Sequence, residues 1–266
     1  MTLLDIAVLA LIQGITEFLP VSSQGHVYLA ENLLGVSDQG LVMVVALHLG
    51  TLGAVVLYFW RDLWAILAGL GRLLRGRSDP GANLAGYLAI ASVPVAIAGF
   101  ALNRYGAEVL RTTPVIAWAT IGFGIVLYAS DRLGMTVRRI EHMRLGDAII
   151  IGLAQALALI PGTSRSGITM SAARMLGMER AEAARFSMLL SIPAILGAGG
   201  LTAVDLYLAG DVALTEAAIL AATMAFIAAT IAISALMAWL RRSSFTPFVV
   251  YRVLLGGALL GIAYGM

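Results

Sequence analysis

Apolar stretches about as long as a 20-residue membrane-crossing helix recur along this chain, and they limit its fold more than any other feature. A chain that is 60% hydrophobic and only 12% charged cannot hide so much apolar surface inside a soluble domain. We therefore predict an all-α integral membrane protein with about six transmembrane helices. The expected spans are 41–60, 84–102, 113–130, 184–207, 214–240 and 245–265.

Two further apolar stretches are too short or too interrupted to be full spans. The first runs over 3–19 and 26–34 and is broken by a polar turn at Pro20. The second occupies about 147–178 and is broken at Pro161. Irregular backbone at membrane depth is tolerated only where it is buried in protein or lines a wet cavity. Each stretch therefore predicts a re-entrant helical hairpin.

The two breaks resemble each other, which indicates an internal repeat. When Pro20 is aligned with Pro161, the hydroxyl residues that follow coincide, so that Ser23 falls on Ser164. We predict a single membrane domain over residues 1–266, made of two pseudo-symmetric halves that cover about 1–135 and 145–266.

The two halves are expected to have opposite orientations in the membrane. Each half contributes one hairpin, which returns to its own side, and three spans, which is an odd number of crossings. The second half therefore enters the membrane inverted, and the tips of the two hairpins meet near the midplane. Inverted repeats with broken helices that meet at depth are a known way to build a substrate site in a membrane.

The distribution of arginine tests this inversion independently, because short cytoplasmic loops of membrane proteins carry an excess of positive charge. The opposite side is expected to hold both termini and two short loops, in which Arg104 and Arg111 are the only arginines. We therefore predict both termini, and the entrance of the first hairpin, outside the cytoplasm. The arginine-rich loops of the cytoplasmic side are 61–80, 131–147, 174–185 and 241–244.

Composition excludes several classes of function. The chain has no cysteine, which removes disulfides, thiolate chemistry and cysteine metal sites. Its net charge of +2 is too small to indicate binding of nucleic acid. The first apolar run lacks a basic start and a small-residue cleavage site, so we interpret it as mature protein rather than as a signal peptide.

Arg165 is the most informative single residue, because a charge this deep in apolar sequence costs about 3 kcal/mol and needs a partner. One interpretation is a structural ion pair with Glu17. The other is an anion clamp, since a guanidinium binds two phosphate oxygens at once. Hydroxyls and backbone N–H groups before a helix expected near Ile168 favour the clamp. The neighbours predicted to bind the anion with Arg165 are Thr163, Ser164, Ser166, Gly167 and Thr169.

Glu17 lies four residues after Gln13, on the same face of a helix. In lipid a carboxylate must be neutral, paired or bound to a metal ion. The Gln13 and Glu17 side chains offer oxygen ligands to a hard cation, so we predict a divalent ion, Mg²⁺ or Ca²⁺, that also binds substrate phosphates. The alternative is a carboxylate that bonds to the backbone of its own turn.

The first break also holds His26, Ser22 and Ser23. A neutral imidazole can act as general base or nucleophile, whereas a serine hydroxyl needs an adjacent base. We predict that Ser23 pairs with His26, and we leave Ser23, His26 and a water activated by His26 open as the attacking group. Ser22 is expected to bind phosphate or to cap the next helix.

Two polar residues lie inside predicted spans. His48 is expected to form a hydrogen bond between helices. Arg252 lies close to the start of its span, so we expect its side chain to extend toward the lipid headgroups. Neither residue is assigned a chemical role.

Together, an acid, an imidazole, hydroxyls, an arginine and a divalent ion are the groups that phosphoryl transfer uses. In that reaction, positioning and neutralisation of charge do most of the catalysis. Inside a membrane, the same groups predict a substrate with phosphate at one end and lipid at the other.

Two long motifs stand in order along the chain: Gln13-x-x-x-Glu17-Phe18-Leu19-Pro20-Val21-Ser22-Ser23-x-Gly25-His26 and Pro161-Gly162-x-Ser164-Arg165-Ser166-Gly167-x-Thr169. They resemble the undecaprenyl-diphosphate phosphatase family, also called the bacitracin-resistance proteins. The resemblance extends over essentially the whole chain in length, number of spans and motif position. That family has Glu or Gln at the first position of the first motif, and the Gln13 of this chain leaves one acid there.

The resemblance implies hydrolysis of undecaprenyl diphosphate, a C55 polyprenyl carrier, to undecaprenyl phosphate and inorganic phosphate. This reaction recycles the lipid for cell-wall synthesis and gives resistance to bacitracin. The resemblance also implies a location in the bacterial cytoplasmic membrane with a site that faces the periplasm. It places Glu17, Ser23, His26 and Arg165 in the active site, supported by Ser164 and Thr169.

The main alternative is a transporter or flippase that moves polyprenyl phosphate or another anionic lipid between leaflets. Inverted repeats and polar breaks at the midplane suit transport equally well. His26 beside Ser23 and Glu17 favours the enzyme, because transport needs an anion clamp but no base or nucleophile. A non-catalytic scaffold gains little from charges that are so costly in lipid. The sequence leaves a homodimer open.

Overall fold

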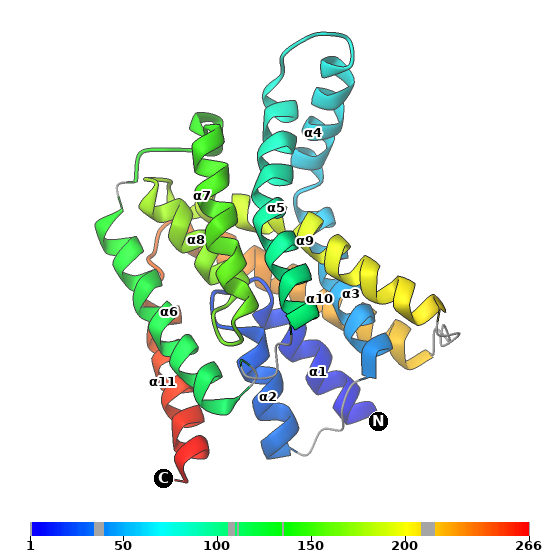
Figure 1. Cartoon of the computed structure of the whole chain (residues 1–266), viewed down its shortest axis with the longest axis vertical. Helices are drawn as coiled ribbons and strands as arrows, with labels where there is room; N and C mark the ends of the chain where they lie inside the picture. Colours follow the sequence, from blue (N-terminus) through cyan, green and yellow to red (C-terminus); the bar gives the residue numbers. More distant parts are fainter. Residues whose placement is uncertain are drawn as a thin grey trace.

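The computed structural model describes residues 2–34, 40–105, 110, 112–134, 136–208 and 216–265. Within these ranges the elements are helices, and none is a β-strand. Figure 1 shows α1 (Leu3–Thr16), α2 (Ser23–Leu34), α3 (Gly40–Tyr58), α4 (Trp60–Leu73), α5 (Pro80–Tyr105), α6 (Thr113–Leu133), α7 (Leu145–Ala156), α8 (Arg165–Met175), α9 (Arg180–Leu208), α10 (Glu216–Leu240) and α11 (Thr246–Tyr264).

Six of these helices are long and apolar enough to cross a membrane, namely α3, α5, α6, α9, α10 and α11. Each coincides with one of the predicted spans, so the all-α membrane architecture is confirmed. Pro114 and Pro247 stand in the first turns of α6 and α11. The missing N–H of proline costs no helical hydrogen bond at that position, which is why both residues begin a helix rather than interrupt one.

The arginine-rich stretch 61–80 is not a plain loop, because most of it forms α4. Trp64 and Leu67 are exposed on one side of this helix, whereas Ile66 is buried. The helix has an acid in its first turn and an arginine in its last, which complements the helix dipole. It is too short for a span, so the apolar pattern that marks the spans does not indicate it.

The helices that lead into the two breaks pack on opposite halves of the chain. α1 lies against α10, where a Cβ added at Gly14 would be 2.6 Å from the Cβ of Ala228. α7 lies against α5, where a Cβ at Gly152 would be 2.7 Å from the carbonyl oxygen of Ala91. Reciprocal contacts of this kind are expected of an inverted repeat. The repeat, its two halves and the re-entrant hairpins themselves stay predictions.

The start of α1 and the end of α11 lie at one end of the molecule, and the connection between α4 and α5 lies at the other (Figure 1). The two termini therefore share one end of the molecule, and the side of the membrane that this end faces stays a prediction. Arg111, one of the two arginines expected on the side of the termini, lies outside the described residues.

Buried ion pairs anchor the far end of α8, the helix that follows the second break. Asp131 of α6 is 4% exposed, and its Oδ1 accepts from Arg174 Nε at 3.2 Å and from Arg180 Nε at 2.7 Å. Its Oδ2 accepts from the backbone N–H of Phe245 at 3.2 Å. One carboxylate thus joins α6, α8, α9 and the residue before α11, which fixes the position of α8.

Candidate active site

Each break ends in a serine with an unusual backbone conformation. The φ angle is 74° at Ser22 and 69° at Ser164, in the left-handed region that residues other than glycine rarely adopt. Ser164 Oγ accepts from the N–H of Gly167 at 3.2 Å, and Ser22 Oγ accepts from the N–H of Gly25 at 3.5 Å. Such a conformation costs about 1–3 kcal/mol and is concentrated at functional sites. By backbone geometry, Ser22 is the counterpart of Ser164. The sequence alignment had instead matched Ser164 with Ser23, the next residue.

The helix after the second break begins at Arg165, earlier than the predicted start near Ile168. The N–H groups of Gly167 and Ile168 donate to the side chain and the carbonyl of Ser164. The N–H groups of Arg165 and Ser166 precede them and have no earlier helical turn to bond to. The Arg165 guanidinium and the positive end of α8 therefore belong to the same short segment.

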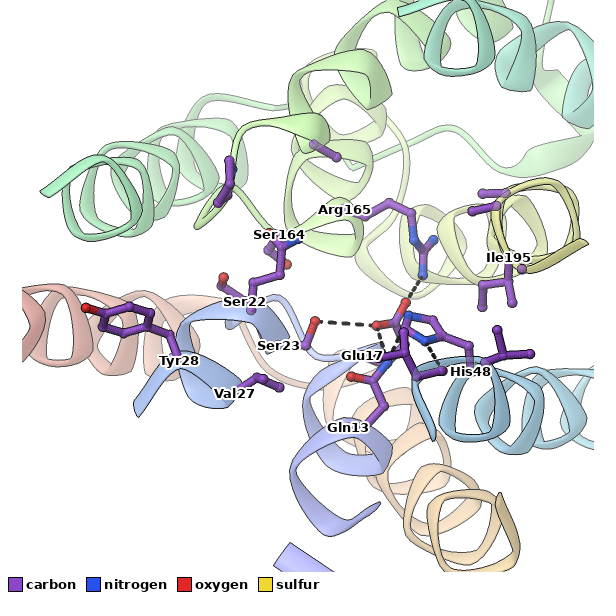
Figure 2. A pocket seen from close by; sticks show the side chains of 18 of the residues that line it. Gln13, Glu17, Ser22, Ser23, Val27, Tyr28, His48, Ser164, Arg165 and Ile195 are labelled. Atoms are coloured by element: carbon purple, nitrogen blue, oxygen red, sulfur yellow. Dashed lines mark hydrogen bonds and ion pairs between the residues drawn. The ribbon is translucent and has the colours of Figure 1, made fainter. Parts of the chain in front are cut away.

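The two turns border one cavity of about 560 Å³, a volume within the usual range for a small-molecule site. Figure 2 shows side chains of both breaks directed toward this space. The predicted site residues on its wall are Gln13, Glu17, Ser22, Ser23, Ser164 and Arg165. Much of the remaining wall is apolar and includes Val27, Val44, Val45, Ala194 and Ile195. The cavity wall therefore combines polar side chains with apolar ones, as an amphiphilic ligand requires.

Glu17 and Arg165 form an ion pair beside the cavity. Arg165 Nη2 donates to Glu17 Oε1 at 3.1 Å, and Arg165 Nη1 donates to the carbonyl of Ser187 at 3.4 Å. The side chain of Arg165 is 16% exposed and that of Glu17 is 10% exposed, so both still reach the cavity. The structural ion pair that the sequence allowed is present, and it leaves the guanidinium at a place where a bound phosphate would compete with Glu17.

The other oxygen of Glu17 joins further polar groups. Glu17 Oε2 accepts from Gln13 Nε2 at 3.0 Å and from Ser23 Oγ at 3.4 Å. Gln13 Nε2 also lies 3.3 Å from Nε2 of His48 on α3, which confirms the predicted hydrogen bond of His48 between helices. Glu17 is therefore the common partner of a guanidinium, an amide and a hydroxyl (Figure 2).

The predicted pairing of Ser23 with His26 is wrong in this structure, because Ser23 donates to Glu17 instead. His26 is not among the residues that line the cavity. Its Nδ1 lies 2.7 Å from the carbonyl of Ser22, and its Nε2 lies 2.5 Å from the hydroxyl of Tyr251, whose ring it stacks on. Since a carbonyl only accepts, Nδ1 carries the proton and Nε2 accepts from Tyr251. A chemical role for His26 stays a prediction, and it requires the imidazole to break its hydrogen bond with the Tyr251 hydroxyl.

Four residues predicted to bind substrate lie behind the cavity wall. Ser166 Oγ donates to the carbonyl of Leu19 at 3.0 Å, which ties the second turn to the first. Thr169 Oγ1 donates to the carbonyl of Arg165 at 2.9 Å. These bonds support the turns from within, and direct contact with a substrate stays a prediction. The other two of these four residues, Thr163 and Gly167, are also buried.

Comparison with known proteins decides the family. Residues 6–258 match the family described as bacitracin resistance protein BacA. The chain belongs to the BacA family. It is 54% identical to undecaprenyl-diphosphatase 1 of Rhodospirillum rubrum over 99% of this chain and 96% of that protein. It is 52% identical to the undecaprenyl-diphosphatase of Ruegeria pomeroyi over 99% of this chain and 100% of that protein. The resemblance seen in the two motifs is thereby confirmed over the full length.

The first BacA motif offers one carboxylate, that of Glu17, to the divalent ion predicted at Gln13 and Glu17, and the ion itself stays a prediction. Among the described residues, no group of three or more His, Cys, Asp or Glu side chains comes together. Gln13 directs its amide nitrogen at Glu17, and both oxygens of Glu17 already accept hydrogen bonds. Mg²⁺ commonly takes one or two carboxylates together with substrate phosphates. The single carboxylate here fits an ion that arrives on a diphosphate better than an ion held by the protein alone.

Arg252 does not extend toward lipid headgroups, because its side chain is fully buried. Its Nε donates to the carbonyl of Thr120 at 2.9 Å and its Nη2 to that of Gly162 at 3.0 Å. Its Nη1 donates to the carbonyl of Pro20 at 3.4 Å. Pro20 and Gly162 belong to the two BacA motifs, so one guanidinium joins both turns. We missed this role because its partners are carbonyls that lie far away in the sequence.

Proposed function

We propose that the chain is a membrane-embedded lipid diphosphatase that hydrolyses undecaprenyl diphosphate to undecaprenyl phosphate and inorganic phosphate. The observation that carries this proposal is the cluster of Ser23, Glu17 and Arg165 on the wall of a cavity that apolar side chains also line. The names of full-length relatives support it. Recycling of the carrier lipid for cell-wall synthesis would give bacitracin resistance, in keeping with the description of the family.

Binding of the substrate follows from the charges on the cavity wall. The guanidinium of Arg165 takes two diphosphate oxygens, and the first N–H groups of α8 add partial positive charge. Ser22 and Ser164 bring their hydroxyl-bearing turns to the same cavity, and its apolar side chains receive the start of the prenyl chain. An ion such as Mg²⁺ enters as part of the diphosphate substrate.

In the chemical step that we propose, Ser23 Oγ attacks the terminal phosphorus. Its proton passes to Glu17, the bond from that phosphorus to the bridging oxygen breaks, and undecaprenyl phosphate leaves with the bridging oxygen. Water then cleaves the phosphoserine ester, which releases inorganic phosphate and restores the Ser23 hydroxyl, while Glu17 gives its proton to solvent. Attack by His26, or by a water that His26 activates, is the competing route.

A trapped phosphoenzyme separates these routes. With substrate labelled in the terminal phosphate, we expect a rapid acid quench to leave label on the protein, because a serine phosphate ester survives acid and a phosphohistidine does not. The label should disappear in Ser23→Ala. A label that is lost in acid, survives an alkaline quench and persists in Ser23→Ala would assign the attack to His26. The absence of covalent label under both quenches would assign it to water.

The main test of the function is release of phosphate by the purified protein. In detergent with undecaprenyl diphosphate and Mg²⁺ or Ca²⁺, we expect steady release of inorganic phosphate. Removal of divalent ions by a chelator should lower the rate by about tenfold or more, because the diphosphate then keeps its full negative charge. No release with either ion would contradict the diphosphatase and favour a lipid flippase, which needs the arginine but no nucleophile.

We also propose that the protein lies in the bacterial cytoplasmic membrane with both termini and the cavity entrance toward the periplasm. The arginine-rich loops support this orientation through the positive-inside bias. The start of α1 and the end of α11 lie opposite the connection between α4 and α5, as this orientation requires (Figure 1). A homodimer stays an expectation.

A further inference from the structure

His48 lies on the wall of the same cavity as Glu17 and Arg165, yet it belongs to neither motif. It comes from α3, a helix that carries none of the other predicted site residues. Figure 2 shows its ring beside the side chains of Gln13 and Glu17. An imidazole in this position either fills space in the wall or acts on the residues next to it.

The hydrogen bonds of His48 determine which ring nitrogen carries the proton. Nδ1 lies 2.8 Å from the carbonyl of Val44, which can only accept, so Nδ1 is the donor. In the neutral ring, Nε2 is then an acceptor and needs a donor. The amide nitrogen of Gln13, 3.3 Å away, is that donor.

The same bond determines the orientation of the Gln13 amide. A side-chain amide has two N–H groups on its nitrogen and none on its oxygen, and its two ends have nearly the same shape. Gln13 uses one N–H for Glu17 Oε2 and the other for His48 Nε2. Its oxygen is turned away from His48 (Figure 2). His48 and Glu17 are both acceptors here, so together they select one of the two orientations.

We propose that His48 is a positioning residue for diphosphate hydrolysis, which it serves by fixing the amide of Gln13. The inference rests on the function proposed above. The Glu17 oxygen that accepts from Gln13 also accepts from Ser23, the proposed nucleophile. By holding the donor end of Gln13 against that oxygen, His48 keeps the carboxylate in the orientation that receives the Ser23 proton.

Loss of the acceptor at position 48 should affect the chemical step more than substrate binding. Without it, Gln13 can rotate its amide, which places one oxygen against another and repels the carboxylate of Glu17. The contact of Arg165 with the diphosphate does not depend on this amide. The expected result is a lower kcat with little change in KM.

The test compares His48→Leu, which removes the acceptor, with His48→Gln, whose amide oxygen restores it. We expect kcat to fall about tenfold in His48→Leu, with KM within about threefold of wild type. His48→Gln should recover most of the lost rate, which a purely space-filling role would not explain. The matched control is His142→Leu, because His142 is an exposed histidine of the short 3-10 helix Ile140–His142 that precedes α7.

A double-mutant cycle tests whether His48 acts through Gln13. In a Gln13→Ala background, His48→Leu should cause no further loss of kcat. Three results would each overturn the inference while the enzyme activity stands. The losses of kcat in the two single variants could add fully in the double variant, His48→Leu could keep the wild-type kcat, or His48→Gln could be as slow as His48→Leu. If the wild-type protein releases no phosphate at all, the proposed function fails, and the role of His48 in it fails as well.

Discussion

Replacement of Arg165 by alanine is expected to lower phosphate release by about 10³-fold or more, the range seen when phosphoryl transfer loses a stabilising arginine. Among the described residues that line the cavity, Arg165 is the only one with a positively charged side chain. Arg165→Lys should recover little, because an ammonium cannot bind two phosphate oxygens in the plane of a guanidinium. Initial rates of phosphate release at saturating substrate measure both effects.

The control for this prediction must separate the clamp from the ion pair with Glu17. A double variant, Arg165→Gln with Glu17→Gln, removes both charges and leaves no unpaired carboxylate. Because Glu17 is also the proposed acceptor of the Ser23 proton, the readout for this variant is binding of undecaprenyl diphosphate rather than turnover. We expect it to fold and to bind the substrate weakly, whereas binding as tight as that of Glu17→Gln alone would show that Arg165 only neutralises Glu17. Arg139→Ala serves as the matched control, because Arg139 pairs with Glu179 at 3.0 Å on the exposed surface. It should keep the wild-type rate within about twofold.

The parts of the site that could be predicted from sequence are those governed by local rules. A charge inside an apolar run requires a partner, and that requirement alone brought Arg165 and Glu17 together. Proline, glycine and serine in an apolar run require a break in the helix, and both breaks lie where they were expected. Span length and apolar content were likewise sufficient to locate all six long helices.

The parts that could not be predicted depend on contacts between residues distant in sequence. The partner of His26 is Tyr251, which comes from the last helix of the chain. Spacing suggested Ser23 as that partner because the two are close in sequence, but the imidazole bonds to Tyr251 and is not among the residues that line the cavity. Gln13 and His48 meet only because α1 packs against α3. No pattern within a single helix contains this information.

The role of Arg252 likewise depends on partners that are distant in sequence. Its replacement is the second change for which we expect a large loss of activity. Arg252→Met keeps the apolar stem and removes the three donors that hold Thr120, Gly162 and Pro20. We expect kcat/KM to fall about 100-fold, because displacement of catalytic groups by about 1 Å can cost that much. Loss of these hydrogen bonds lowers the free energy of unfolding, whereas removal of a buried charge raises it. The two effects oppose each other, so stability should change much less than activity. Phosphate release and thermal unfolding of the same preparation measure the two quantities.

Two further variants show whether the geometry of Arg252 or merely its charge matters. The carbonyls lie in different directions and one ammonium cannot reach all of them, so Arg252→Lys should remain well below wild type. Arg132→Met is the matched control, since Arg132 is exposed on α6 and lies 5.3 Å over the ring of Tyr128. It should leave the rate unchanged. A fully active Arg252→Lys would mean that buried charge suffices, and a fully active Arg252→Met would mean that the bond from Ser166 to Leu19 already holds the two turns together.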